Sequence, residues 1–206
     1  SRKSESTKPY KVSQPVMNAL NAALHASYKN VEPSNKDIML VIDISGSMYW
    51  NMLPNFFPFY PGEAAGLMAL ILAHIESNYY PMVFSDNVQP ISLSSTDSIE
   101  NIIVELNRYP MGGTNIGAPV EYARDNNLNI DAFISITDGQ VNAGRHTFQL
   151  IRQYRDKTGI PSKFVTVAME ANNLTVADPK DPLMLDVVGC SSDTQDTVIS
   201  YIRGDF

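Results

Sequence analysis

The chain contains a single cysteine, Cys190, among its 206 residues. It therefore forms no internal disulfide and has no C-x-x-C pair for a thiophilic metal. So little cysteine is typical of a reducing compartment, and we expect a cytoplasmic protein. Basic residues are also few, with 15 Lys and Arg against 22 Asp and Glu and a net charge of −7. This balance argues against a domain that binds the phosphates of nucleic acid.

Long apolar runs are missing too. The longest spans residues 64–73, which is too short to cross a bilayer, and the polar residues 1–11 carry no signal-peptide core. We therefore expect no contact with membrane. Charged residues make up only 18% and hydrophobic residues 44%, values that favour a packed core over disorder. We expect a polar tail or linker at residues 1–12 and one domain at residues 13–206, which includes an N-terminal helix.

Apolar strands alternate with helical segments along that domain. We expect strands at residues 37–43, 79–84, 88–93, 132–137, 163–169 and 184–188, and helices at residues 16–28, 61–75, 98–108, 116–126, 146–156 and 194–203. Strands that are apolar throughout are buried on both faces, so the pattern predicts an α/β, Rossmann-like fold with a mostly parallel sheet between helices. Pro90 cannot donate to a ladder, which makes residues 88–93 an antiparallel edge strand.

The most informative motif is Asp43-Ile44-Ser45-Gly46-Ser47, which directly follows the first apolar strand. One carboxylate and two hydroxyls stand at alternate positions, and Gly46 allows the backbone to fold tightly enough for them to converge. These are hard oxygen ligands, suited to Mg²⁺, Mn²⁺ or Ca²⁺ and not to a thiophilic metal.

Two later loops add similar groups. Thr114 follows Gly112-Gly113, and Asp138 follows the strand at residues 132–137. Taken singly, each piece is explained by a turn or a helix cap, but that reading does not account for three such loops. Because the carboxyl ends of parallel strands share one edge of a sheet, Asp43 and Asp138 should lie together. The candidate metal ligands are Asp43, Ser45, Ser47, Thr114 and Asp138.

This D-x-S-x-S, G-G-T and T-D-G pattern resembles the metal-ion-dependent adhesion site of von Willebrand factor A domains. The resemblance implies that the hydroxyls of Ser45, Ser47 and Thr114 contact the metal, while Asp43 and Asp138 act through water or through the serines. It implies Mg²⁺, with Mn²⁺ or Ca²⁺ as alternatives, and a non-enzymatic site. Neutral hydroxyls leave the charge of the metal largely uncompensated, so an acidic side chain of a partner protein would complete the coordination.

Further segments are similar to the Ro autoantigen (TROVE-domain) family. They are residues 30–36 (NVEPSNK), 84–86 (FSD), 109–114 (YPMGGT), 143–144 (AG), 154–155 (YR), 159–163 (GIPSK), 175–179 (TVADP) and 184–186 (MLD). Members of that family combine an A domain with a ring of helical repeats that binds Y RNA and misfolded small RNAs. The resemblance implies a ribonucleoprotein in which this A domain recruits protein partners, and RNA binds to a ring absent from this chain.

Two other functions fit parts of the pattern. One is an A domain of a metal chelatase or of an AAA ATPase assembly, which would use the same binding chemistry. The other is a Mg²⁺-dependent phosphatase of the haloacid dehalogenase type, but that enzyme needs a second acid where this chain has Ser45. The aromatic loop at residues 49–60 follows Ser47 and should border the site. It serves either as a partner surface or as a cover for the sheet edge.

Overall fold

The structure is a computed structural model that describes residues 31–53, 59–139, 147–169 and 176–205, together with positions 15, 18, 19, 22 and 28. The expected tail at residues 1–12 and most of the expected helix at residues 16–28 lie outside the described residues. The same holds for residues 54–58 in the middle of the aromatic loop.

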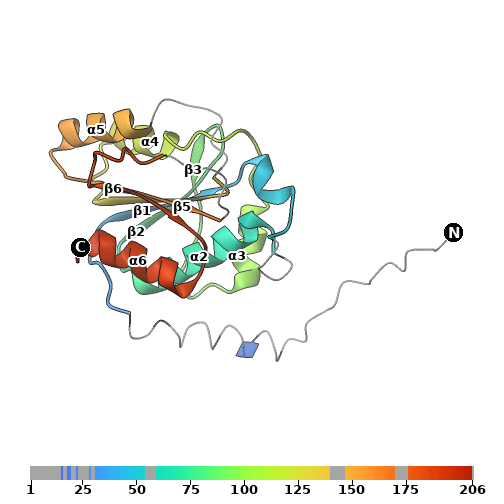
Figure 1. Cartoon of the computed structure of the whole chain (residues 1–206). Coiled ribbons are helices and arrows are strands. Elements are labelled where there is room, and N and C mark those ends of the chain that lie inside the picture. The colour runs from blue at the N-terminus through green and yellow to red at the C-terminus, as the bar shows by residue number, and fades with distance from the viewer. Residues whose placement is uncertain are drawn as a thin grey trace.

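A six-stranded sheet forms the centre of the domain (Figure 1). The order of its strands is β3-β2-β1-β4-β5-β6, and only the edge pair β2–β3 is antiparallel. The strands are β1 (Ile38–Asp43), β2 (Tyr79–Phe84), β3 (Val88–Pro90), β4 (Ala132–Thr137), β5 (Lys163–Ala168) and β6 (Met184–Val188). The predicted α/β fold, with its mostly parallel sheet and antiparallel edge strand, is thereby confirmed.

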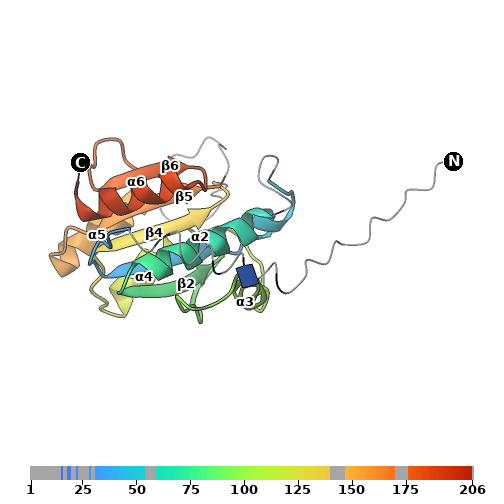
Figure 2. The same ribbon diagram turned by 90° about the horizontal axis from the view of Figure 1, so that it is seen from below.

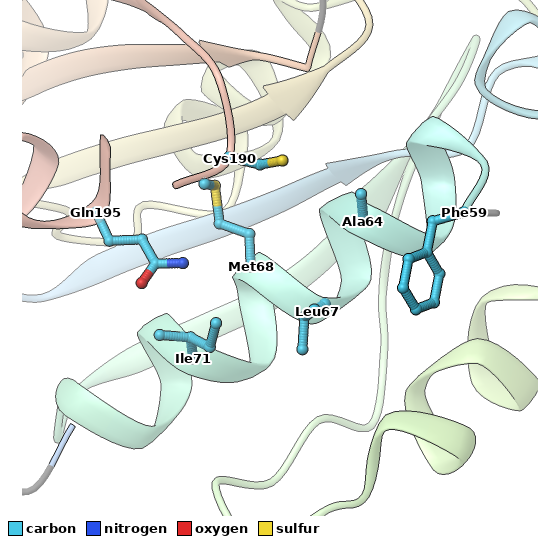
Figure 3. A pocket seen from close by; sticks show the side chains of 7 residues that line it. All are labelled: Phe59, Ala64, Leu67, Met68, Ile71, Cys190 and Gln195. Carbon is cyan, nitrogen blue, oxygen red and sulfur yellow. The ribbon is translucent and has the colours of Figure 1, made fainter. Parts of the chain in front are cut away.

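Helices cover both faces of the sheet. Figure 1 shows α4 (Ala118–Asp125) and α5 (Thr147–Thr158) on one side. On the opposite side, which faces the viewer in Figure 2, lie α2 (Pro61–Ile75), α3 (Ile99–Leu106) and α6 (Ser192–Arg203). The longest described helix, α2, has 15 residues. In the described part of the chain, none of the helices has the combined length and apolar content of a bilayer-spanning segment.

The alternation of side chains along β1 divides the core into two layers. Ile38, Leu40 and Ile42 point toward the α2 side, whereas Met39 and Val41 belong to the cluster beneath α4 and α5. All six residues of β1 are buried, as expected for the central strand of a sheet covered on both faces. Asp43 continues the alternation of Met39 and Val41, so its carboxylate emerges at the carboxyl end of the α4–α5 face.

The helix α2 is the main packing element of the other face. Pro61 occupies its first turn, where a missing N–H costs nothing, and Glu63 accepts a hydrogen bond from the backbone N–H of Tyr60 at 3.0 Å. Twelve of its 15 residues are buried. This helix begins close to the short 3-10 helix η1 (Gly46–Tyr49), which follows β1, so packing of α2 fixes the loop that carries the serines.

Candidate metal centre

The candidate ligands lie at the carboxyl edge of the sheet, where the strand order reverses. The chain runs from β1 outward to β2 and β3 and then returns to the other side of β1 as β4. In open α/β sheets, such a reversal leaves a crevice at the carboxyl ends of the two central strands. Asp43 is the last residue of β1, and Asp138 directly follows β4.

The Asp43 carboxylate is fully buried and held by two hydrogen bonds. Its Oδ1 accepts from the backbone N–H of Ser45 at 2.7 Å, and its Oδ2 accepts from the Thr137 hydroxyl at 2.6 Å. Burial raises the pKa of Asp43 to about 7, although the hydrogen bonds from Thr137 and Ser45 lower it, and the nearby charge of Asp138 raises it further. The neighbouring hydrogen-bond donors orient this desolvated carboxylate. A cation placed beside it would favour its ionised form.

The hydroxyls of Ser45 and Ser47 lie close together. Their Oγ atoms are 3.2 Å apart. Two oxygens at neighbouring corners of a Mg²⁺ octahedron, each about 2.1 Å from the ion, lie about 3.0 Å apart. The η1 turn produces this spacing, since it begins at Gly46 and folds Ser47 back toward Ser45. The pair is therefore spaced as two adjacent ligands of a small divalent cation.

A second loop brings Thr114 to the same edge. The carbonyl of Gly112 accepts from the backbone N–H of Gly46 at 3.2 Å, and the backbone N–H of Asn115 donates to the carbonyl of Ser85 at 2.9 Å. A Cβ at position 112 would lie 2.4 Å from a carboxylate oxygen of Asp86, so any larger residue there would require the Asp86 side chain to move. These contacts place Thr114, which is fully buried, in the loop that packs against the Asp43–Ser47 segment.

Asp138 is buried as well, with 1% of its surface exposed. The next residue, Gly139, has a φ of 87°, and its N–H donates to the Thr137 hydroxyl at 3.2 Å. This left-handed turn ends β4 and suits glycine. All five candidate ligands thus come from three loops at one edge. Four of them are at most 2% exposed, and Ser47 is partly exposed.

Thr137 also belongs to this site, in addition to the five predicted ligands. It lies across the β1–β4 ladder from Asp43, one step beyond the paired residues Ile42 and Ile136. Its hydroxyl donates to Asp43 and accepts from Gly139, so it links two of the loops. Its signal in the sequence is its place directly before Asp138 in Thr137-Asp138-Gly139.

The donor set fits a hard divalent cation. Three hydroxyls and two carboxylates are oxygen ligands of the kind that Mg²⁺, Mn²⁺ and Ca²⁺ prefer. Within the described ranges, no group of three or more His, Cys, Asp or Glu side chains is arranged to hold a metal. Metal binding at this edge would therefore depend on the serine and threonine hydroxyls.

Comparison with known proteins identifies a matching family model and longer proteins that are similar to this chain. The family model for the Ro60 vWA domain matches residues 37–202. The chain is 33% identical over 193 residues to an RNA-binding protein RO60 of Caenorhabditis elegans, covering 93% of this chain and 30% of the relative. It is 30% identical over 191 residues to an RNA-binding protein RO60 of Deinococcus radiodurans, covering 92% and 36%. The chain thus spans about a third of the length of these relatives.

Solved structures agree with the fold. The crystal structure of the Deinococcus radiodurans RO (RSR) protein superposes with a TM-score of 0.84 at 29% identity, covering 94% of this chain and 39% of that one. A proximal thread matrix protein from mussel byssus, solved with a zinc-occupied MIDAS motif, has a TM-score of 0.50 at 16% identity, covering 84% and 48%. At so low an identity, the second likeness concerns the fold alone.

Proposed function

Because the chain belongs to the Ro60 vWA domain family, we propose that it is a non-enzymatic binding domain with a metal-ion-dependent adhesion site. The site would hold one divalent cation, Mg²⁺ in the cell, and bind an acidic side chain of a partner protein. The observation that carries this proposal is the Ser45–Ser47 hydroxyl pair, 3.2 Å apart and next to the buried Asp43 carboxylate.

Each ligand has a distinct role in this proposal. The hydroxyls of Ser45, Ser47 and Thr114 would contact the cation, while Asp43 and Asp138 would hold it through water or through the serines. Asp43 keeps its orientation through Thr137 and the backbone of Ser45. The bound cation supplies positive charge that neutral hydroxyls do not cancel, and this charge attracts a carboxylate. Since most of the ligands are buried, the partner would approach past the partly exposed Ser47.

The relatives extend this proposal to the whole protein. Two of them are named RNA-binding proteins and are about three times as long as this chain. We infer that the complete protein is a cytoplasmic ribonucleoprotein that binds Y RNA or misfolded small RNA through helical repeats outside this domain. The A domain would recruit a protein to that RNA. The acidic charge of this chain, −7, fits this division of work.

Titration calorimetry with MgCl₂ tests the metal site. Wild type should bind one Mg²⁺, whereas Asp43→Asn and Ser47→Ala should lose measurable binding because each removes part of the oxygen cage. Ser135→Ala is a matched control, since Ser135 is another buried hydroxyl on β4 that lies outside the ligand set. Equal binding by wild type and Asp43→Asn would contradict the assignment.

The partner chemistry has its own test. Capture of a protein partner from lysate should weaken several-fold with EDTA and with Thr114→Ala, because a charge-assisted contact is lost. The captured surface should lose binding when its Glu or Asp is changed to the amide. Capture that is unaffected by EDTA and by Thr114→Ala would show that the metal does not carry the interaction.

A further inference from the structure

The loops that form the candidate site also expose large apolar side chains. Among the described residues, the exposed large hydrophobic side chains include Trp50 at 72%, Met52 at 50% and Met111 at 57%. Trp50 and Met52 follow the serine loop, and Met111 precedes the glycines of the threonine loop. Single exposed apolar residues are ordinary, but several beside one polar site indicate a contact surface.

Two contacts locate Trp50, and the backbone next to Met111, beside the serines. The indole Nε1 of Trp50 lies 3.6 Å from the position that a Cβ on Gly46 would take. The N–H of Gly46 donates to the carbonyl of Gly112, the residue next to Met111. Both loops therefore meet at Gly46, which stands between the two serine hydroxyls. We call the exposed side chains of Trp50 and Met111 the apolar rim.

The charges at this edge favour the binding of an anionic ligand only when the cation is present. Asp43 and Asp138 lie within the site, and Asp86 contacts the threonine loop at Gly112. Without a cation, these acidic groups oppose the approach of an anion. With a cation, a carboxylate is attracted but must displace water. A carboxylate ligand that also covers exposed apolar surface is stabilised by the hydrophobic effect, whereas a water molecule bound to the cation is not.

We propose that the ligand of this site is an acidic side chain flanked by an aromatic or large aliphatic group, and that the apolar rim binds that group. This inference rests on the metal-dependent carboxylate binding proposed above, and it adds the chemical class of the ligand. The partner segment would therefore be acidic and apolar together, which distinguishes it from the many solvent-exposed acidic segments that carry charge alone. Trp50 and Met111 act here as specificity-determining residues.

Small carboxylates test the class directly. Acetate and phenylacetate carry the same charge, and only phenylacetate has a ring for the rim. In the Mg²⁺-loaded domain, phenylacetate should bind about two- to ten-fold more tightly than acetate, the range expected for one aromatic contact. Trp50 is the only tryptophan in the chain, so its fluorescence should change on phenylacetate binding. Calorimetry supplies the affinities independently of that signal.

Variants separate the rim from the metal site. Trp50→Ala should abolish the advantage of phenylacetate and Met111→Ala should reduce it, with acetate binding unchanged in both. Tyr80→Ala is the matched control. Tyr80 is 42% exposed but lies near the amino end of β2, whereas the candidate site lies at the carboxyl ends of the strands. It should keep the full advantage.

The outcomes distinguish the two proposals. If neither acid binds in a Mg²⁺-dependent manner, both the proposed function and the rim proposal are overturned. If both acids bind equally with Mg²⁺, the rim proposal alone is overturned. An advantage of phenylacetate that persists in EDTA or in Ser47→Ala would also overturn it, because the apolar contact would then be independent of the cation.

Discussion

At the scale of single residues, several buried polar groups in this domain are held by neighbours distant in sequence. Asp43 bonds to Thr137 across 94 positions, and Tyr154 accepts from the N–H of Ile130 at 2.8 Å while donating to the carbonyl of Leu128 at 2.6 Å. Burying a polar group without such a partner destabilises the folded state. These bonds therefore fix both the site and the frame around it.

Glu76 provides a pH-dependent test at this scale. It is 4% exposed, and its carboxylate accepts from the N–H and the hydroxyl of Ser34. Burial raises the pKa of Glu76, although the Ser34 hydrogen bonds lower it. The native state then keeps a proton that the unfolded chain has released. Ionisation of Glu76 should therefore lower the free energy of unfolding as pH rises from about 4.3, the ordinary pKa of Glu, through the higher native pKa.

Urea denaturation over that pH range checks the prediction. Wild type should lose more stability than Glu76→Gln between about pH 4.3 and neutral pH, since glutamine does not titrate. Ser34→Ala is the informative control, because it removes the hydroxyl hydrogen bond, one of the contacts that oppose the raised pKa of Glu76, and should steepen the loss. A constant difference between wild type and Glu76→Gln at every pH would contradict the assignment.

At the scale of elements, apolar patterning predicted the sheet closely. The bounds of β2, β4 and β6 agree with the expected strands, because buried parallel strands read as continuous apolar runs. The edge strand was predicted to reach residue 93 but ends at Pro90. Ile91 and Leu93 are buried beyond it, and the N–H of Ile91 still donates to the carbonyl of Pro81 on β2 at 3.0 Å. Their apolar character therefore reflects packing into the core.

The candidate site was only partly predictable. The shared edge of Asp43 and Asp138 followed from strand ends, whereas the loop of Thr114, which comes after α3, was included for its Gly112-Gly113-Thr114 pattern. The structure brings these three segments to one edge. Two features did not follow: the 3-10 turn η1 and the role of Thr137. A four-residue turn has no periodicity to detect, and the bond from Thr137 to Asp43 depends on the register of β1 with β4. Tertiary packing, which local patterns do not encode, decides both.

The contact between η1 and α2 gives a prediction for these elements. A Cβ on Gly62, in the first turn of α2, would lie 2.4 Å from the ring of Tyr49, the last residue of η1. Gly62→Ala should displace that ring and with it the turn that carries Ser47. We expect Mg²⁺ affinity to fall several-fold in calorimetry, even though alanine favours the helix by up to about 1 kcal/mol.

Gly66→Ala is the matched control for this prediction. Gly66 lies one turn further along α2, and its added Cβ would meet the end of the flexible Leu106 side chain, away from η1. This variant should bind Mg²⁺ as wild type does, while its thermal stability reports the general cost of a methyl group in α2. If both variants bind Mg²⁺ normally, the position of η1 does not depend on its contact with α2.

At the scale of the whole molecule, the charges of the described residues argue against RNA binding by this domain. The arginines at positions 108, 124, 152, 155 and 203 each pair with an acidic side chain. Lys157 and Lys163 donate to backbone carbonyls. Acids also outnumber bases, 22 to 15. Cations already engaged within the fold are poorly placed to replace the counterions of a phosphate backbone.

We therefore expect residues 1–206 alone to bind RNA weakly or not at all. The relatives named RNA-binding proteins are about three times as long, which fits the proposal that RNA binds outside this domain. A gel-shift titration with a structured small RNA at about 0.15 M salt tests this, since weaker screening would exaggerate charge effects.

Parallel titrations in Mg²⁺ and in EDTA distinguish RNA binding through basic side chains from RNA binding through the metal. Submicromolar binding in EDTA would reveal a basic RNA surface and contradict the prediction. Binding that requires Mg²⁺ and is lost in Ser47→Ala would instead make phosphate, not carboxylate, the ligand of the candidate metal centre.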